Sequence, residues 1–228
     1  MSSPHNPQTF DETKHRLSQI GDQARANFAN THAAREKLLH ECRKVIRNSA
    51  NSIRATHRGE FRQARKILDD TTVLLKQLED LREIDPRIYF TGTVEDSHKE
   101  FAEAEVTLAF AECAPLPDPH ALGIGDAPYL NGLAEAIGEL RRFILDSLRR
   151  DDFSRCEELL NLMDEAYTVL VTMDYPDAVT RGLRRSTDMV RGILERTRGD
   201  LTIALRQQRT EEKLAKFQRS IDDKHTQG

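Results

Sequence analysis

Two short stretches of this 228-residue chain each carry a pair of glutamates at helical spacing. Glu100 and Glu103 lie in KEFAEAEVTLAF, and Glu135 and Glu139 lie in YLNGLAEAIGEL. At about 100° per residue each pair falls on one side of its helix, where like charges one turn apart repel. Mg²⁺ and Mn²⁺ prefer oxygen ligands, so two facing helices of this kind could hold one or two ions and offset the repulsion. The solvated faces of ordinary surface helices give the same pattern, so both interpretations stay open.

The metal hypothesis makes two structural predictions. Carboxylate oxygens from the two pairs should approach within ~4–5 Å, and at least one of the four should have a raised pKa.

Gly132 and Gly138 lie inside the second stretch. Each costs ~0.5–1 kcal/mol relative to alanine, and close packing against another helix would explain them.

Two known all-α metal patterns differ from this spacing. Ferritin-like di-iron bundles use Glu-x-x-His, but Glu103 stands three residues after Glu100 and Gly138 three after Glu135. All-α nucleoside triphosphate pyrophosphatases are similar in carrying Glu-x-x-Glu and then Glu-x-x-Asp. The second pair here is Glu-x-x-x-Glu, and the proline-rich connection is long. A pyrophosphatase is therefore the less favoured alternative.

The elements that must position these residues are helices, because apolar residues recur every three or four positions along most of the chain. We expect an all-α, single-domain bundle of about six or seven long helices over residues 11–218, with residues 1–10 and 219–228 disordered. The expected helices cover about 11–59 (one helix or two nearly continuous ones), 61–85, 87–113 with a break near Gly92, 126–149 with Asp126 as N-cap, a fifth starting at Asp151 or Asp152, and a sixth reaching about Phe217.

Composition excludes several classes of protein. No apolar stretch approaches the ~20 residues of a membrane span, and the start MSSPHNPQTF lacks the apolar core of a secretion signal, so we expect a cytoplasmic protein without a membrane partner. Cys42, Cys113 and Cys156 are too widely spaced for a zinc or disulfide framework, which favours buried free thiols. The net charge is −4, but residues 35–66 carry ten Lys or Arg against three Glu.

Several motifs follow one another in a distinctive order. Tyr129-Leu130-x-Gly132 and Gly138-Glu139-Leu140 are preceded by REKLLHECRKVIRNSANSIRATHRG and followed by ILDSLRRDDFSRCEELLNLMDEAYTVL. This order of motifs resembles the translin superfamily. The likeness runs from about Arg35 to Leu205, which covers most of the chain.

The resemblance implies one of two activities. The catalytic branch of the superfamily, a metal-dependent endoribonuclease, carries Glu-x-x-Glu and then Asp-x-x-x-Glu, while translin itself binds nucleic acid without strong catalysis. Glu100, Glu103 and Glu139 match the catalytic pattern, and Glu135 takes the place of its aspartate. The implied function is cleavage of single-stranded or short structured RNA, with these four glutamates as catalytic residues and ligands of Mg²⁺ or Mn²⁺. The alternative is a non-catalytic assembly that binds RNA or single-stranded DNA.

The resemblance also implies a homo-oligomer, because family members form hollow octamers with the nucleic acid inside. Basic residues in the long first helix are candidates to hold the phosphate backbone: Arg35, Lys37, Arg43, Lys44, Arg47 and Arg54. A solvated cationic face paired with Glu36 and Glu41 is an equal alternative. Because aromatic residues make up only 6% of the chain, we expect backbone contacts rather than base stacking.

Overall fold

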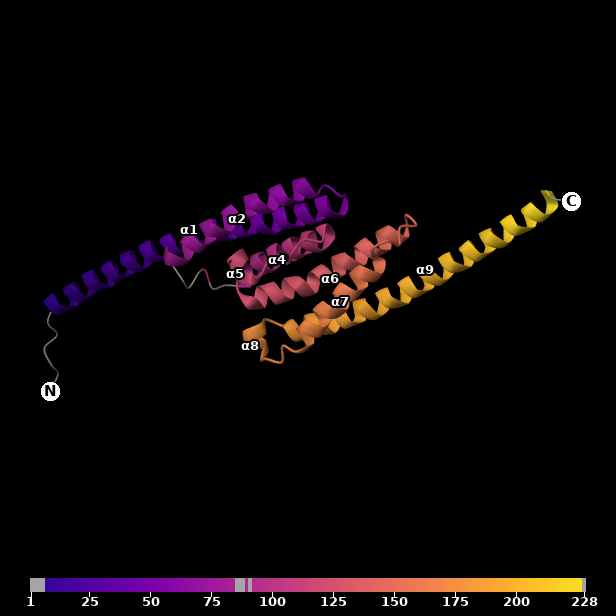
Figure 1. The fold of residues 1–228 in the computed structure, drawn as a ribbon. Coiled ribbons are helices and arrows are strands. Elements are labelled where there is room, and N and C mark those ends of the chain that lie inside the picture. The colour runs from indigo at the N-terminus through magenta and orange to yellow at the C-terminus, as the bar shows by residue number, and fades with distance from the viewer. Residues whose placement is uncertain (1–6, 85–88, 90–91, 227–228) are drawn as a thin grey trace.

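The structure, a computed structural model, describes residues 7–84, 89 and 92–226, and within them the chain is helical with no strand (Figure 1). Six long helices and two single turns follow one another in the described residues: α1 (Pro7–His57), α2 (Phe61–Ile84), α4 (Gly92–Glu112), α5 (Pro119–Leu122), α6 (Asp126–Leu148), α7 (Cys156–Val171), α8 (Asp177–Thr180) and α9 (Leu183–Thr226). The predicted all-α bundle of long helices is confirmed. No described helix is long and apolar enough to cross a membrane.

The first and last helices are longer than the sequence predicts. α1 is a single helix that ends at the predicted position, where Gly59 adopts a left-handed φ of 74° before α2 begins. At their outer ends α1 begins at Pro7 and α9 continues to Thr226, so both run into ranges expected to be disordered. Extending a formed helix adds one hydrogen bond for each residue fixed, so polar residues without apolar periodicity can still continue it.

Two predicted helix starts are wrong. Gly125, and not Asp126, is the N-cap of α6, and Asp126 is the first helical residue. The acidic run before α7 does not begin that helix, which starts at Cys156. Asp152 instead accepts hydrogen bonds from the Ser154 backbone N–H (3.0 Å) and hydroxyl (2.6 Å). Such local bonds stabilise a turn in competition with a helix.

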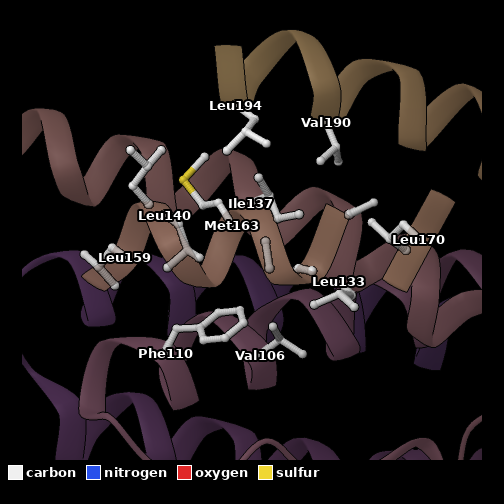
Figure 2. Packing of buried hydrophobic residues seen from close by; sticks show 14 of the residues in the cluster. Val106, Phe110, Leu133, Ile137, Leu140, Leu159, Met163, Leu170, Val190 and Leu194 are labelled. Carbon is white, nitrogen blue, oxygen red and sulfur yellow. The ribbon is translucent and has the colours of Figure 1, made fainter. Parts of the chain in front are cut away.

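α4 lies at the centre of the bundle and is buried on most of its circumference. On one side it packs with α1 and α2 through a cluster that includes Leu38, Leu68 and Phe101. On the other side it packs with α6, α7 and α9 through a second cluster, shown in Figure 2: Val106, Phe110, Leu133, Ile137, Leu140, Leu159, Met163, Leu170, Val190 and Leu194. Because α4 is shared by both clusters, any polar side chain on it that faces a neighbouring helix is held in a packed environment.

The three cysteines are free thiols. Cys42 and Cys156 are buried, as predicted. The prediction is wrong for Cys113, which is exposed because it follows the last turn of α4 with a left-handed φ of 56°.

Candidate metal centre

Gly132 lets α6 approach the backbone of α4. A Cβ atom at this position would lie 2.5 Å from the carbonyl oxygen of Lys99 and 2.9 Å from the amide nitrogen of Glu103. Both distances are too short for real atoms, so only glycine fits this helix crossing. The predicted packing role of Gly132 is confirmed. Gly138 differs, since the nearest atom to its Cβ position would be Ile193 Cδ1 at 4.0 Å, and close packing does not explain it.

The crossing brings three of the four predicted carboxylates together. One oxygen each from Glu100 and Glu103 on α4 and Glu135 on α6 lie within 4.8 Å of one another. The predicted approach of ~4–5 Å is therefore confirmed for these three, which we call the carboxylate cluster. Glu139 does not belong to it.

Burial and repulsion from neighbouring carboxylates disfavour the ionised forms of Glu103 and Glu100. Glu103 is 9% exposed, and burial first, then the charges of Glu135, Glu100 and Glu139, raise its pKa to about 8. Burial also raises the pKa of Glu100, with Lys99 acting in the opposite direction. The predicted raised pKa is confirmed. Three hard oxygen ligands that repel one another at this separation fit a divalent cation such as Mg²⁺ or Mn²⁺, because oxygens on opposite sides of one such ion lie ~4–5 Å apart.

Lys99 contributes a positive charge that sequence analysis missed. Its Nζ lies 2.7 Å from Glu135 Oε1, to which it donates a hydrogen bond, and 3.5 Å from Glu100 Oε1. Burial lowers the pKa of Lys99, but the hydrogen bond and charge of Glu135 outweigh it, and the pKa is raised. Lys99 stands four residues before Glu103, so helical spacing alone could have placed it on the same side of the helix. Its pairing with Glu135 on the other helix could not be read from spacing.

Glu139 is held instead by a histidine from α1. The Nε2–H of His57 donates a hydrogen bond to Glu139 Oε2, and the imidazole packs beside Phe143 with ring centroids 5.0 Å apart. This hydrogen bond, opposed by burial, lowers the pKa of Glu139. Neither glutamate motif contains a histidine, and 82 residues separate this pair in the sequence. They meet because α1 and α6 both pack against α4, and the last residue of α1 reaches α6 there.

The six basic candidates all lie on α1. Arg35, Lys37, Arg43, Arg47 and Arg54 are exposed. Lys44 is partly buried and donates to Glu41 at 3.0 Å, and Arg35 lies 3.8 Å from Glu36, so the alternative of local ion pairs holds for these two. The exposed pair of Arg35 with Glu36 contributes little to stability, ~0–1 kcal/mol. Arg43 and Arg47 make no ion pair with another residue in the described part of the chain.

The chain is similar to proteins of known sequence and structure. It is 30% identical over 192 residues to an uncharacterised protein of Methanocaldococcus jannaschii, covering 84% of this chain and 85% of that protein. It is 33% identical to AfC3PO, with a TM-score of 0.73 over 80% of this chain and 95% of AfC3PO, which has been solved alone and in complex with duplex RNA. The apo structure of NeC3PO has the same fold, with a TM-score of 0.73 and 17% identity over 80% of this chain and 96% of that one. No family model matches the sequence.

Proposed function

This chain belongs to the translin superfamily, as do AfC3PO and NeC3PO, and on that premise we propose that it is a metal-dependent endoribonuclease. The observation that supports catalysis is the carboxylate cluster, where oxygens of Glu100, Glu103 and Glu135 lie within 4.8 Å of one another. The observation that supports RNA as the substrate is the 33% identity to AfC3PO, which binds duplex RNA. The substrate is single-stranded or short structured RNA.

Each glutamate has a separate part in this proposal. Glu100, Glu103 and Glu135 hold Mg²⁺ or Mn²⁺, which when bound activates water and offsets charge on the phosphate oxygens. Glu139 is the fourth carboxylate of the set, and its charge still contributes to the raised pKa of Glu103. His57 fixes the orientation of Glu139, as outer hydrogen-bond partners do for carboxylates at metal sites. Glu135 replaces the family's aspartate, and its longer side chain reaches the cluster.

Lys99 favours one alternative function. Its ammonium group already balances part of the negative charge of Glu135 and Glu100. A cluster neutralised in this way could persist in a protein that binds RNA or single-stranded DNA without cleaving it, as translin does. Metal binding therefore has to be measured separately from cleavage.

The test offers the purified chain labelled RNA and nucleoside triphosphates with Mg²⁺ or Mn²⁺, and measures Mn²⁺ binding by calorimetry. We expect RNA cleavage, lost in Glu103→Gln together with a roughly tenfold or greater loss of Mn²⁺ affinity. Glu112→Gln is the matched control, because Glu112 is an exposed residue of the same helix outside the cluster. RNA binding without cleavage would favour the translin-like alternative, and triphosphate hydrolysis to monophosphate would favour a pyrophosphatase.

The exposed arginines of α1 are the proposed contacts to the RNA backbone. For single strands, the logarithm of the binding constant falls with the logarithm of salt concentration by ~0.7 per contacted phosphate. Changing Arg43 and Arg47 together to alanine should reduce that slope while helical content stays unchanged. An unaltered slope would show that these two arginines belong to an ordinary solvated surface and do not contact the RNA backbone.

We also propose that the chain is a homo-oligomer, an octamer by its family. The outer ends of α1 and α9 project beyond the bundle in opposite directions (Figure 1). Both ends expose large apolar side chains: Leu17, Ile20 and Phe28 on α1, and Leu214, Phe217 and Ile221 on α9. Such rows on projecting helices are suited to burial against another copy. Light scattering on the purified chain gives the subunit number, and a monomer would contradict the proposal.

A further inference from the structure

A cavity of about 360 Å³ adjoins the carboxylate cluster. Its wall comes from three parts of the chain: one face of α4, the first turns of α6, and the turn between α8 and α9. Glu135 lines this cavity and is also a member of the carboxylate cluster, so the two share a wall. The volume lies in the lower part of the range of ~300–1,000 Å³ for small-ligand sites.

The turn on the far side of this cavity is fixed to α6. Arg181 and Gly182 have successive left-handed φ values of 54° and 81°, which turn the chain sharply into α9. Asn131 of α6, which is buried, donates a hydrogen bond to the carbonyl oxygen of Thr180 (2.9 Å) and accepts one from the hydroxyl of Ser186 (2.8 Å). The first turn of α9 is thereby held at a set position relative to α6.

Most charges that line the cavity are already paired. Lys99 is bonded to Glu135 at 2.7 Å, and Arg181 to Glu95 at 2.7 Å. Arg185, in the first turn of α9, is exposed and makes no ion pair or side-chain hydrogen bond within the described residues. Its guanidinium is the lining cation that remains available to a ligand. Asp96, another lining residue, is exposed and likewise makes no ion pair among these residues. Its negative charge offsets the positive charge of Arg185 at a distance. An anion is therefore recognised here by direct contact with Arg185 and not by a broad positive field.

We propose that this cavity receives the nucleotide next to the cleaved bond of the RNA strand, with the phosphate of that nucleotide bound by Arg185. A strand whose reacting phosphodiester lies at the carboxylate cluster places its neighbouring nucleotide close to that cluster, and this cavity adjoins the cluster at Glu135. A guanidinium binds a phosphate in bidentate geometry, which positions the strand as well as holding it. The inference rests on the proposed function, because it takes RNA as the substrate.

The neighbouring Arg184 provides a matched control. It is the same residue type, one position earlier on α9 and also exposed, but it lines a different cavity beside Asp174 and Asp188. Both arginines make no ion pair with another described residue. Removing either one changes the net charge equally, so only a direct contact distinguishes them.

The experiment measures binding of a fluorescent eight-nucleotide single-stranded RNA by anisotropy, in EDTA so that no cleavage occurs, over a series of salt concentrations. Arg185→Ala should weaken binding and reduce the log–log salt slope by ~0.7, the loss of one phosphate contact, while Arg184→Ala leaves the slope unchanged. Arg185→Lys should keep the slope, because it keeps the charge. Thermal unfolding of all three variants should match the unmodified chain.

Two outcomes would overturn this inference in different ways. If the unmodified chain binds the RNA but the Arg185→Ala and Arg184→Ala slopes are equal, the cavity does not hold a phosphate, and the proposed function stands without it. If the unmodified chain does not bind the RNA, the proposed function fails and this site fails with it.

Discussion

Glu103 on α4 and Glu139 on α6 have the same side chain and the same predicted role, but the structure gives them opposite environments. Glu103 faces other carboxylates in a buried position, and its pKa is raised to about 8. Glu139 accepts a hydrogen bond from His57, and its pKa is lowered. One site therefore disfavours a negative charge and the other stabilises it.

The difference shows that a carboxylate's chemistry depends on its neighbours in space. The carboxylates of its own motif and of the facing one repel Glu103, and the positive charge of Lys99 opposes them only in part. Glu139 meets a histidine from a third helix that neither motif contains. A divalent cation has more repulsion to offset at Glu103 than at Glu139, where a hydrogen bond already favours the ionised form.

The largest effect should come from separating the two helices that create the cluster. We expect Gly132→Ala to destabilise the fold by about 3 kcal/mol, because the added Cβ would meet backbone atoms of Lys99 and Glu103 at 2.5 and 2.9 Å. Thermal unfolding measures this change. The variant should also lose Mn²⁺ affinity, since Glu135 moves away from Glu103. Unchanged stability would mean that α4 and α6 do not cross as closely as the structure shows.

Replacing Glu103 and Glu139 one at a time should change the free energy of unfolding in opposite directions. In EDTA at neutral pH, Glu103→Gln should raise the free energy of unfolding by ~2 kcal/mol, because it removes a carboxyl group whose ionised form is disfavoured. Glu139→Gln should lower it by ~1–2 kcal/mol, since it weakens a charge-assisted hydrogen bond with His57. Denaturant titration measures both. Changes of the same sign would contradict the comparison.

The pH dependence of these two changes should also differ. Because the folded pKa of Glu103 exceeds its usual value of 4.5, its favourable contribution is complete below about pH 4.5 and is lost as the pH rises through about 8. The gain from Glu103→Gln should therefore grow across this range and vanish in acid. The folded pKa of Glu139 is lowered, so its contribution is present above 4.5 and is lost as the pH falls through the folded pKa. Unfolding curves at several pH values test both trends.

The smallest effect concerns the second glycine of α6. Gly138→Ala should stabilise the chain by ~0.5–1 kcal/mol, because alanine favours the helix and its Cβ would meet only Ile193 Cδ1, at the ordinary distance of 4.0 Å. The opposite signs expected at Gly132 and Gly138 make each the control for the other. A destabilised Gly138→Ala variant would show that α6 is packed more tightly at Glu139 than the structure indicates.

The sequence by itself determined the helices and much of the carboxylate cluster. Apolar spacing predicted an all-α bundle, because a helix places residues three and four apart on one side wherever it lies. The same local geometry placed Glu100 with Glu103 on one side of a helix. The resemblance to the translin superfamily then assigned Glu135 to the same metal site. Helix starts were harder, because Asp126 and Asp152 can each satisfy backbone groups in more than one local conformation.

Only the tertiary structure decided which charges meet. Gly132 and Gly138 look alike in the sequence, but one lies against the backbone of α4 and the other does not. Lys99 reaches Glu135 across that crossing, and His57 reaches Glu139 from a helix 82 residues away in the chain. Helical periodicity specifies which side of a helix a residue occupies, but not which helix covers that side. The packing of α1, α4 and α6 supplies that information, and with it the difference between Glu103 and Glu139.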